Sequence, residues 1–207
     1  MSNSEETAPG FVPAEDSPTF RRDYGTSDHA DLLCVQQCLE GRSDRFEEIV
    51  GRYQRPVFNV IYHMVHDYED SREIAQSVFL KAFSNLSRFD QTRRFFSWLC
   101  RIAMNESINF VNARRASEPI AGDYASPAAS PEDEAQAAEI RVCLRRAMRK
   151  LTPEYRAVVT LRHFANCSYR EAAEVLGIPE QTVKSRLFSA RQILRDELKA
   201  RGFGGSE

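Results

Sequence analysis

The sequence predicts an all-α protein made of two small helical domains and a flexible linker. Apolar residues recur at helical spacing along most of the 207 residues, and few segments show the alternation of a β-strand. Residues 114–137 interrupt this pattern with prolines among alanine, serine and acidic residues. We therefore expect one domain at residues 28–113 and another at 138–201, each near the lower size at which a domain folds alone.

Four helices account for the first domain. They are expected at Asp28–Glu40, Asp44 to about His66, Glu69 to about Ser87 and Phe95 to about Asn112. Gly41 ends the first helix, and Pro56 predicts a kink in the second. Residues 1–27 are rich in Ser, Glu, Pro and Thr, so a disordered acidic tail is expected there. Residues 202–207 form a short C-terminal tail.

The fourth of these helices has two distinct faces. Its core face consists of apolar residues, Leu99, Ile102, Ala103 and Phe110. Its second face combines an aromatic ring, a guanidinium and three amides, Trp98, Arg101, Asn105, Asn109 and Asn112. Rings stack on bases, guanidinium groups contact phosphates, and amides read base edges, so this face suits unpaired nucleic-acid bases. The alternative is that Trp98 belongs to the core and the asparagines coat a solvated helix.

The second domain contains the signals of a helix-turn-helix. Ser168 followed by Glu171 predicts a capping box at a helix start. Gly177 can adopt the left-handed conformation of a sharp turn, and Pro179 suits the first turn of the next helix. A short alanine-rich helix before the glycine lets the two helices cross closely.

The helix after this turn also has two stripes. The core stripe is apolar and consists of Val183, Leu187, Ala190 and Leu194. The other stripe consists of Lys184, Phe188, Arg191 and Arg195. Between Gln181 and Arg195 there are four basic residues and no acidic one. Beside the turn signature, this favours a helix that enters the major groove of DNA over a merely solvated basic face.

The charge distribution agrees with that interpretation. The whole chain has a formal net charge of −2, but residues 138–201 contain 14 Lys/Arg and 7 Asp/Glu, a net charge of +7. No phosphate-binding glycine loop, nucleophile elbow or metal-ligand set is present, so an enzyme is not expected. The sequence has neither a signal peptide nor the ~20 apolar residues of a membrane helix. We expect a cytoplasmic protein that does not insert into a membrane.

The five cysteines have no framework spacing, which fits a reducing compartment. Cys34 and Cys38 lie one helical turn apart, with His63 and His66 further along, which leaves a metal or redox site open. The spacing matches no standard four-ligand pattern. Buried cysteines and ordinary surface histidines are the favoured alternative, and neither a metal nor a cofactor is expected.

Two blocks of sequence together are far more specific than either alone. "YEDSREIAQSVFLKAFSNLSRFD" followed by "FFSWLCRIAMNESINF" resembles region 2 of extracytoplasmic-function sigma factors. "LTPEYRAVVTLRHFANCSYREAAEVLGIPEQTVKSRLFSARQIL" resembles their region 4. The resemblance implies an alternative sigma factor, which lends promoter recognition and strand opening to core RNA polymerase and is not itself a catalyst. A free-standing helix-turn-helix repressor or activator is the other reading of the second block.

The resemblance also implies three sets of site residues. Core polymerase would be bound by the third helix through Glu69, Asp70, Glu73, Gln76 and Phe79. The single-stranded −10 element would be bound by the loop 87–94 and the fourth helix through Phe89, Arg94, Trp98, Arg101, Asn105 and Asn109. The −35 duplex would be bound by Gln181, Thr182, Lys184, Ser185, Phe188 and Arg191.

The implied partners are core RNA polymerase, through its largest and second-largest subunits, promoter DNA and an anti-sigma factor. The linker would pass through the active-site cleft of the polymerase. Some positions depart from the pattern of relatives, namely Ser71, Ser77, Asn109 and Ser189. The first two reduce the acidity of the third helix, and the last stands beside the −35 contacts, so the −35 sequence does not follow from the resemblance.

Overall fold

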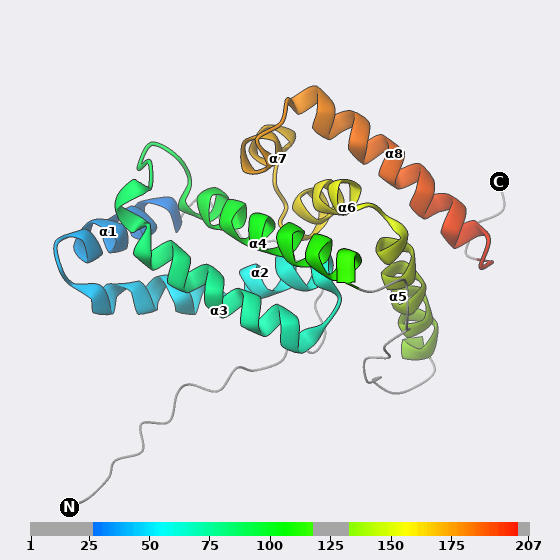
Figure 1. The fold of residues 1–207 in the computed structure, drawn as a ribbon, viewed down its shortest axis with the longest axis horizontal. Coiled ribbons are helices and arrows are strands. Elements are labelled where there is room, and N and C mark those ends of the chain that lie inside the picture. The colour runs from blue at the N-terminus through cyan, green and yellow to red at the C-terminus, as the bar shows by residue number, and fades with distance from the viewer. Residues whose placement is uncertain (1–26, 118–132, 203–207) are drawn as a thin grey trace, which may run out of the picture.

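A computed structural model describes residues 27–117 and 133–202 of the chain (Figure 1). Within these ranges all regular structure is helical, which confirms the predicted fold class. Residues 1–26 of the expected tail, the middle of the expected linker and residues 203–207 of the C-terminal tail lie outside the described residues. None of the described helices is both long and apolar enough to cross a membrane.

The helices form two groups in chain order. The first helical group consists of α1 (Ser27–Leu39), η1 (Ser43–Arg45), α2 (Phe46–Val65), α3 (Tyr68–Ser84), η2 (Leu86–Arg88) and α4 (Phe95–Ser117). The second helical group consists of α5 (Asp133–Lys150), α6 (Pro153–Val159), η3 (Thr160–Phe164), α7 (Tyr169–Leu176) and α8 (Glu180–Lys199). Here η1 and η2 are 3₁₀ turns and η3 is a π-helical turn.

α2 is the central helix of the first group and packs against both α3 and α4 (Figure 1). Its core residues recur at helical spacing and are fully buried, Ile49, Tyr53, Val57, Ile61 and Met64. α2 continues through Pro56 as one helix. Tyr53 stacks on Phe96 of α4, with ring centroids 5.2 Å apart, so aromatic packing joins the two helices.

α4 is longer than its local sequence pattern predicts. It ends at Ser117 instead of near Asn112, and therefore enters the segment expected as linker. Two contacts with distant parts of the chain stabilise the additional turn. Arg114 pairs with Asp70 on α3 at 3.2 Å, and Arg115 donates to the Leu151 carbonyl at 3.3 Å. α5 likewise begins at Asp133, inside the other end of that segment.

The helix-turn-helix follows its sequence signals closely. The side chains and backbone amides of Ser168 and Glu171 form the predicted capping box at the start of α7. Gly177 ends α7 in the left-handed region, with φ of +65°. Pro179 is the residue before the helix rather than part of its first turn, because α8 begins at Glu180. Val183 and Leu187 are buried as predicted.

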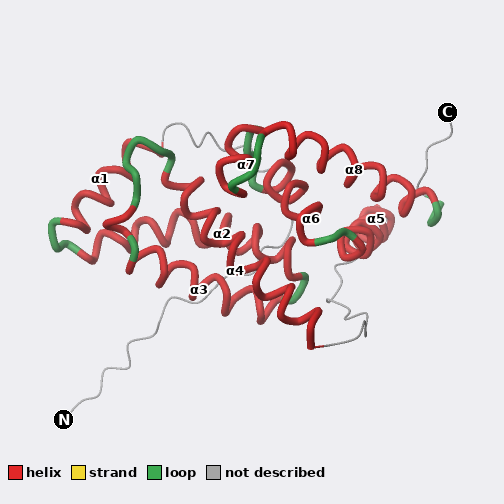
Figure 2. The backbone as a smooth tube through the Cα atoms, turned by 45° about the horizontal axis from the view of Figure 1, so that its top comes forward, coloured by secondary structure: helices red, strands yellow, loops and turns green. Residues whose placement is uncertain are grey.

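The two helical groups are packed together on one shared apolar core (Figure 2). α4 lies against α6 and α7, and α2 lies against α6 and η3. The buried Arg156 of α6 donates to the carbonyls of Met148, Arg149 and Leu151 within its own group. It also donates to the Met64 carbonyl near the C-terminal end of α2, at 2.6 Å. Helix C-termini favour positive charge, and the guanidinium of Arg156 lies at helix ends of both groups. This one side chain therefore joins the two groups.

His63 of α2 and His66, the residue directly after α2, also lie at this junction. The ring of His63 stacks on Phe164 of η3, with centroids 3.4 Å apart. The expectation of ordinary surface histidines is wrong here: His66 is buried, and His63 is half-buried. Among the described residues, no group of three or more His, Cys, Asp or Glu side chains is arranged to hold a metal.

Candidate nucleic-acid interface

The loop between η2 and α4 is held by its own hydrogen bonds. The Asp90 carboxylate accepts from the Thr92 hydroxyl at 2.7 Å and from the Thr92 amide at 3.0 Å. The Thr92 hydroxyl bond is the main cause that lowers the pKa of Asp90, and Arg93 adds to it. Phe89 anchors the loop from below, since it is only 6% exposed and lies 5.2 Å from the ring of Phe95.

Trp98 belongs both to the core and to the surface. Its ring lies 5.3 Å from Phe89 and 5.4 Å from Phe95, so one side of the indole packs in the interior. The residue is half-buried, and it also lines a hollow on the outside of the molecule. The alternatives of a core tryptophan and an accessible ring are therefore both realised by one side chain.

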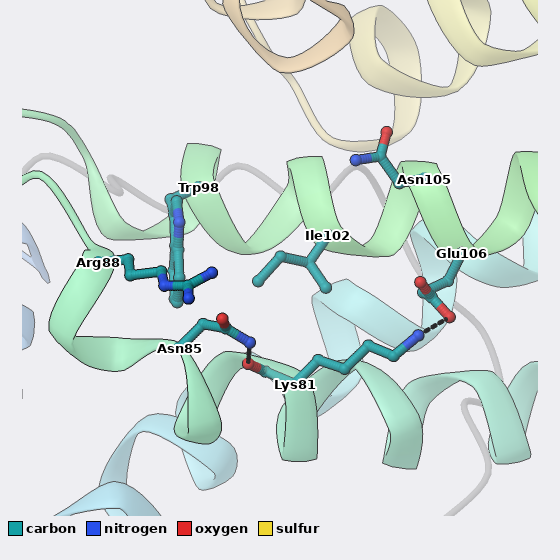
Figure 3. A pocket seen from close by; sticks show the side chains of 7 residues that line it. All are labelled: Lys81, Asn85, Arg88, Trp98, Ile102, Asn105 and Glu106. Atoms are coloured by element: carbon teal, nitrogen blue, oxygen red, sulfur yellow. Dashed lines mark hydrogen bonds and ion pairs between the residues drawn. The ribbon is translucent and has the colours of Figure 1, made fainter.

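This hollow lies between the C-terminal half of α3 and the exposed side of α4 (Figure 3). Its volume is about 290 Å³, and its lining residues come from three elements, Lys81, Asn85, Arg88, Trp98, Ile102, Asn105 and Glu106. Trp98 and Arg88 stand at one end, Ile102 lies in the middle, and Lys81 pairs with Glu106 at the other end (Figure 3). An aromatic ring, a guanidinium and polar groups around an apolar floor suit a planar polar ligand such as a base.

The residues expected to contact the −10 element do not all gather at the hollow. Trp98 and Asn105 line it, Phe89 lies beneath Trp98 in the core, and Asn109 is exposed further along α4. The two arginines of the set, Arg94 and Arg101, face the second helical group.

Arg94 and Arg101 lie at the junction with the helix-turn-helix. Arg94 pairs with Glu171 of α7 at 2.5 Å and with Asp28 of α1 at 3.2 Å. The Arg101 Nη2 atom lies 3.9 Å from the position that a Cβ atom would take on Gly177. In this arrangement Arg94 contacts protein where the resemblance expects DNA, and the exposed Arg101 lies beside the turn that contains Gly177.

Sequence reasoning singled out none of four residues of the hollow, namely Lys81, Asn85, Arg88 and Glu106, although the expected loop 87–94 contains Arg88. The first three follow one another at spacings of four and three, so they share a face of α3 and η2. That spacing was a usable signal. Only the pairing of α3 with α4, however, shows that this face borders Trp98 instead of open solvent.

The outer side of α3 holds the residues expected to bind core polymerase. Glu69, Glu73 and Gln76 are exposed, whereas Phe79 is half-buried against the core. Asp70 is half-buried as well, and burial raises the pKa of its carboxyl group.

The same side of α3 also presents apolar residues outside the expected set. Leu80 is 69% exposed and Phe83 is 43% exposed, and they follow Gln76 at spacings of four and three. Large apolar side chains in this position are typical of a protein-binding surface.

α8 presents its expected residues to solvent. Gln181, Lys184, Ser185, Phe188 and Arg191 are exposed, and Thr182 is half-buried. Phe188 is 67% exposed, which is unusual for an aromatic ring. Lys184 pairs with Glu180 at 2.7 Å and lies 5.5 Å from the centre of the Tyr169 ring. α8 runs along the outer side of the second group, where DNA can reach it (Figure 1).

Comparison with known proteins decides between the alternatives that the helix-turn-helix leaves open. The family description "Sigma-70 region 2" matches residues 49–117, and "Sigma-70, region 4" matches residues 141–194. The RNA polymerase sigma-H factor of Pseudomonas aeruginosa is 31% identical over 181 residues, covering 82% of this chain and 94% of that protein. The chain belongs to the extracytoplasmic-function sigma factors of the sigma-70 family.

Other members of the family agree over nearly their full length. The ECF RNA polymerase sigma factor SigW of Bacillus subtilis is 29% identical over 177 residues, covering 80% of this chain and 95% of that protein. The structure of CnrH in complex with the cytosolic domain of CnrY superposes with a TM-score of 0.65 at 27% identity, covering 83% and 98% of the two chains. As an extracytoplasmic-function sigma factor, the chain is an alternative transcription initiation factor whose partners are core RNA polymerase and promoter DNA. The family is one of non-enzymatic transcription factors.

Proposed function

We propose that this sigma factor reads a promoter with two separate surfaces. The second helical group binds the −35 element as a duplex through the exposed face of α8. The first helical group binds the −10 element as a single strand through the loop 87–94 and the hollow between α3 and α4. The observation that carries the proposal is the hollow itself. Trp98 and Asn105 line a space that suits a nucleic-acid base, and the same chain carries a helix suited to duplex DNA.

The two surfaces require DNA in different states. A recognition helix fits the major groove of a closed duplex, where Lys184 donates to a base edge or phosphate and Phe188 contacts a thymine methyl. A hollow between two helices admits a base only after that base leaves the stack, at a cost of a few kcal/mol. The −35 contact should therefore form before strand opening, and the −10 contact should form with it.

The experiment compares Lys184→Ala with Asn105→Ala in reconstituted holoenzyme on promoter fragments that the wild-type holoenzyme selects from genomic DNA. Lys184→Ala should weaken closed-complex binding by about 1–3 kcal/mol if the contact is to a base. Asn105→Ala should leave duplex binding intact and reduce the permanganate reactivity of the −10 region. A premelted −10 bubble should restore Asn105→Ala only partly, since base capture is still missing. Normal opening by Asn105→Ala would refute the assignment of the hollow.

Core polymerase is the partner of the outer side of α3 in this proposal. Glu69, Asp70, Glu73, Gln76 and Phe79 supply the expected contacts, and the exposed Leu80 extends them with apolar area. Leu80→Ala should weaken holoenzyme assembly and leave the thermal unfolding of the chain nearly unchanged, because the side chain is already largely in water. Assembly at wild-type affinity would show that core polymerase binds elsewhere.

The remaining assignments complete the proposal. Residues 28–113 and 138–201 act as the two functional domains, and the chain works in the cytoplasm without catalysis of its own. An anti-sigma factor is a further proposed partner. The complex of CnrH with the cytosolic domain of CnrY supports this, because CnrH is 27% identical to this chain and binds another protein. Co-purification of the chain from its source bacterium, followed by identification of bound proteins, tests the assignment.

A further inference from the structure

His66 is a buried polar side chain at the junction of the two helical groups. It lies directly after α2 and is 8% exposed. Both of its ring nitrogens are buried, and neither has a hydrogen-bond partner among the described residues. Buried polar atoms are nearly always satisfied, because an unpaired donor or acceptor away from water is costly. The ring therefore points to a place where a bound group supplies the missing partner.

The charged groups around this ring are basic. Burial lowers the pKa of His66. The charged groups that lower this pKa further are Arg156, His63, Arg149 and Arg145. The carboxylate next in sequence, that of Asp67, caps α3 by accepting from the Asp70 amide at 3.0 Å. A group that approaches the ring thus meets positive potential, which favours an anion over a neutral partner.

Two of these guanidinium groups come from one face of α5. Arg145 and Arg149 are four residues apart, so they are neighbours on the helix surface, and both are half-buried. Arg149 donates from Nη2 to the His66 carbonyl at 3.3 Å, which places its guanidinium beside that residue. Like charges at this spacing repel each other, and an anion bound between them removes the repulsion.

Arg156 adds a third positive charge from the interior. Its guanidinium is buried and donates to the carbonyls of Met64 and Arg149 at 2.6 and 2.9 Å. Its donors are therefore used within the protein, and it acts on a ligand through its charge. We call His66, Arg145, Arg149 and Arg156 together the basic junction.

We propose that the basic junction binds the phosphate group of a small anionic ligand. Arg145 and Arg149 donate to phosphate oxygens from the solvent side, where their half-buried side chains reach water. His66 donates a ring N–H from the interior side. His66 follows α2, whereas the arginines belong to α5 and α6, so the bound ligand joins the two helical groups.

The test measures phosphate binding by the full-length chain. Inorganic phosphate, pyrophosphate and a nucleoside diphosphate are titrated by calorimetry in phosphate-free buffer, at a constant ionic strength of about 0.15 M. At least one of these probes should bind at a single saturable site with Kd of about 1 mM or lower. The same probe should raise the temperature of thermal unfolding, because it binds the folded chain. Absence of saturable binding up to about 10 mM for all three overturns the proposal.

A matched pair of variants on α5 separates the site from general attraction. Arg145→Gln removes one charge from the basic junction and should weaken binding by about tenfold or more. Arg146→Gln makes the same change of charge at the next, exposed residue and should alter affinity by less than about twofold. Equal weakening by both variants would show that the chain attracts phosphate without a defined site, and would overturn the proposal.

The ring of His66 provides a direct readout of the location. In a chain with isotope-labelled histidine, the ring nitrogen signals of His66 should shift when the binding probe is added. The signals are assigned by their absence in His66→Asn. Asparagine is among the residues that tolerate a left-handed backbone, which this position has at φ of +62°. A probe that binds and leaves these signals unchanged overturns the assigned location.

The three probes also distinguish the source of the phosphate group. Equal affinity for inorganic phosphate and the nucleoside diphosphate supports a site for phosphate alone. Tighter binding of the nucleoside diphosphate supports a nucleotide ligand whose sugar or base makes further contacts. A short DNA duplex that binds in a manner dependent on Arg145, with no binding of the three small probes, would overturn the proposal and assign the basic junction to a nucleic-acid backbone.

Discussion

Arg156 shows how one residue can be charged, buried and structural at once. It is 4% exposed, and burial lowers its pKa to about 10, so the guanidinium remains protonated at neutral pH. Its charge is compensated by carbonyl groups at helix ends instead of by a carboxylate. A planar group with five donors can satisfy several carbonyls that point in different directions, which an ammonium cannot do.

Replacing Arg156 should therefore destabilise the chain strongly. Arg156→Ala leaves several buried carbonyls without donors, and we expect the free energy of unfolding to fall by about 3 kcal/mol or more. Arg156→Lys should recover only part of this loss. Urea unfolding followed by circular dichroism measures both variants. The exposed Arg195→Ala is the control and should change stability by less than about 0.5 kcal/mol. Equal stability of Arg156→Ala and wild type would contradict the role described.

His63 should make stability depend on pH. Burial, reinforced by Arg145, lowers the pKa of His63 from its ordinary value of 6.5 to about 4. The unfolded chain thus binds a proton near pH 6.5 that the folded chain does not bind until about pH 4. The resulting stability is fully present above pH 6.5 and is lost as the pH falls toward 4.

The variant His63→Phe keeps a ring against Phe164 and removes this titration. Between pH 6 and 4.5 its stability should fall less steeply than that of wild type, by up to about 1.4 kcal/mol per pH unit. Urea unfolding at several pH values gives the slopes, and the same slope for both proteins would show that His63 is protonated in the folded state. Burial lowers the pKa of His66 to about 2. A substitution at His66 would not test this titration alone, because its backbone has φ of +62° and a different side chain there would also change the backbone strain.

At the scale of elements, the helix-turn-helix is the part that local sequence predicts best. Its capping box and its turn glycine act over three or four residues, so the sequence contains the whole cause. α4 shows the opposite case. Its last turn depends on the distant partners Asp70 and Leu151, and no local signal marks it. The α4 side of the hollow is predictable from the sequence, because Trp98 and Asn105 share one helix face. The α3 side is not, because its residues reach the hollow only through tertiary packing.

Gly177 and Gly51 make a matched pair for testing the turn. Gly177 has φ of +65°, and a Cβ atom there would meet only Arg101 Nη2 at 3.9 Å, so backbone strain alone decides the cost. Gly177→Ala should destabilise the chain by about 1 kcal/mol. Gly51 lies within α2, and no atom lies within 4 Å of its added Cβ, so Gly51→Ala should stabilise by about 0.5–1 kcal/mol. Thermal unfolding compares the two, and equal signs would refute the explanation.

At the scale of the whole molecule, the packed arrangement differs from the one that the proposed −10 and −35 contacts require. The −35 and −10 elements lie roughly 25 base pairs apart, about 85 Å along B-DNA at 3.4 Å per base pair. In the structure, Arg101 of the expected −10 set has its Nη2 atom 3.9 Å from the position that a Cβ atom would take on Gly177, in the turn before α8. In the proposed function one chain binds both elements at once, so we expect the two helical groups to separate on the promoter.

Energy transfer between two dyes should detect this separation. Cysteines introduced at Glu47 on α2 and Lys199 on α8 are exposed and lie outside the proposed interfaces. Transfer should be efficient in the free chain and should fall when core polymerase and promoter DNA are added. Transfer that stays constant throughout would show that the groups are already apart in solution, or remain packed on the promoter.

The shared apolar core has a consequence for how the chain passes from one partner to the next. Cys100, Leu161 and Cys167 lie in one buried cluster to which both helical groups contribute. Separation would therefore expose apolar surface on both groups at once. If the two groups separated in free solution, the exposed apolar surface would make the chain prone to aggregation and to proteolysis. We therefore expect the two groups to separate on the surface of core polymerase, which can cover the apolar surface of each group as it becomes exposed. We expect direct transfer of this sigma factor between binding partners, in which one protein releases the chain only when the next has bound it.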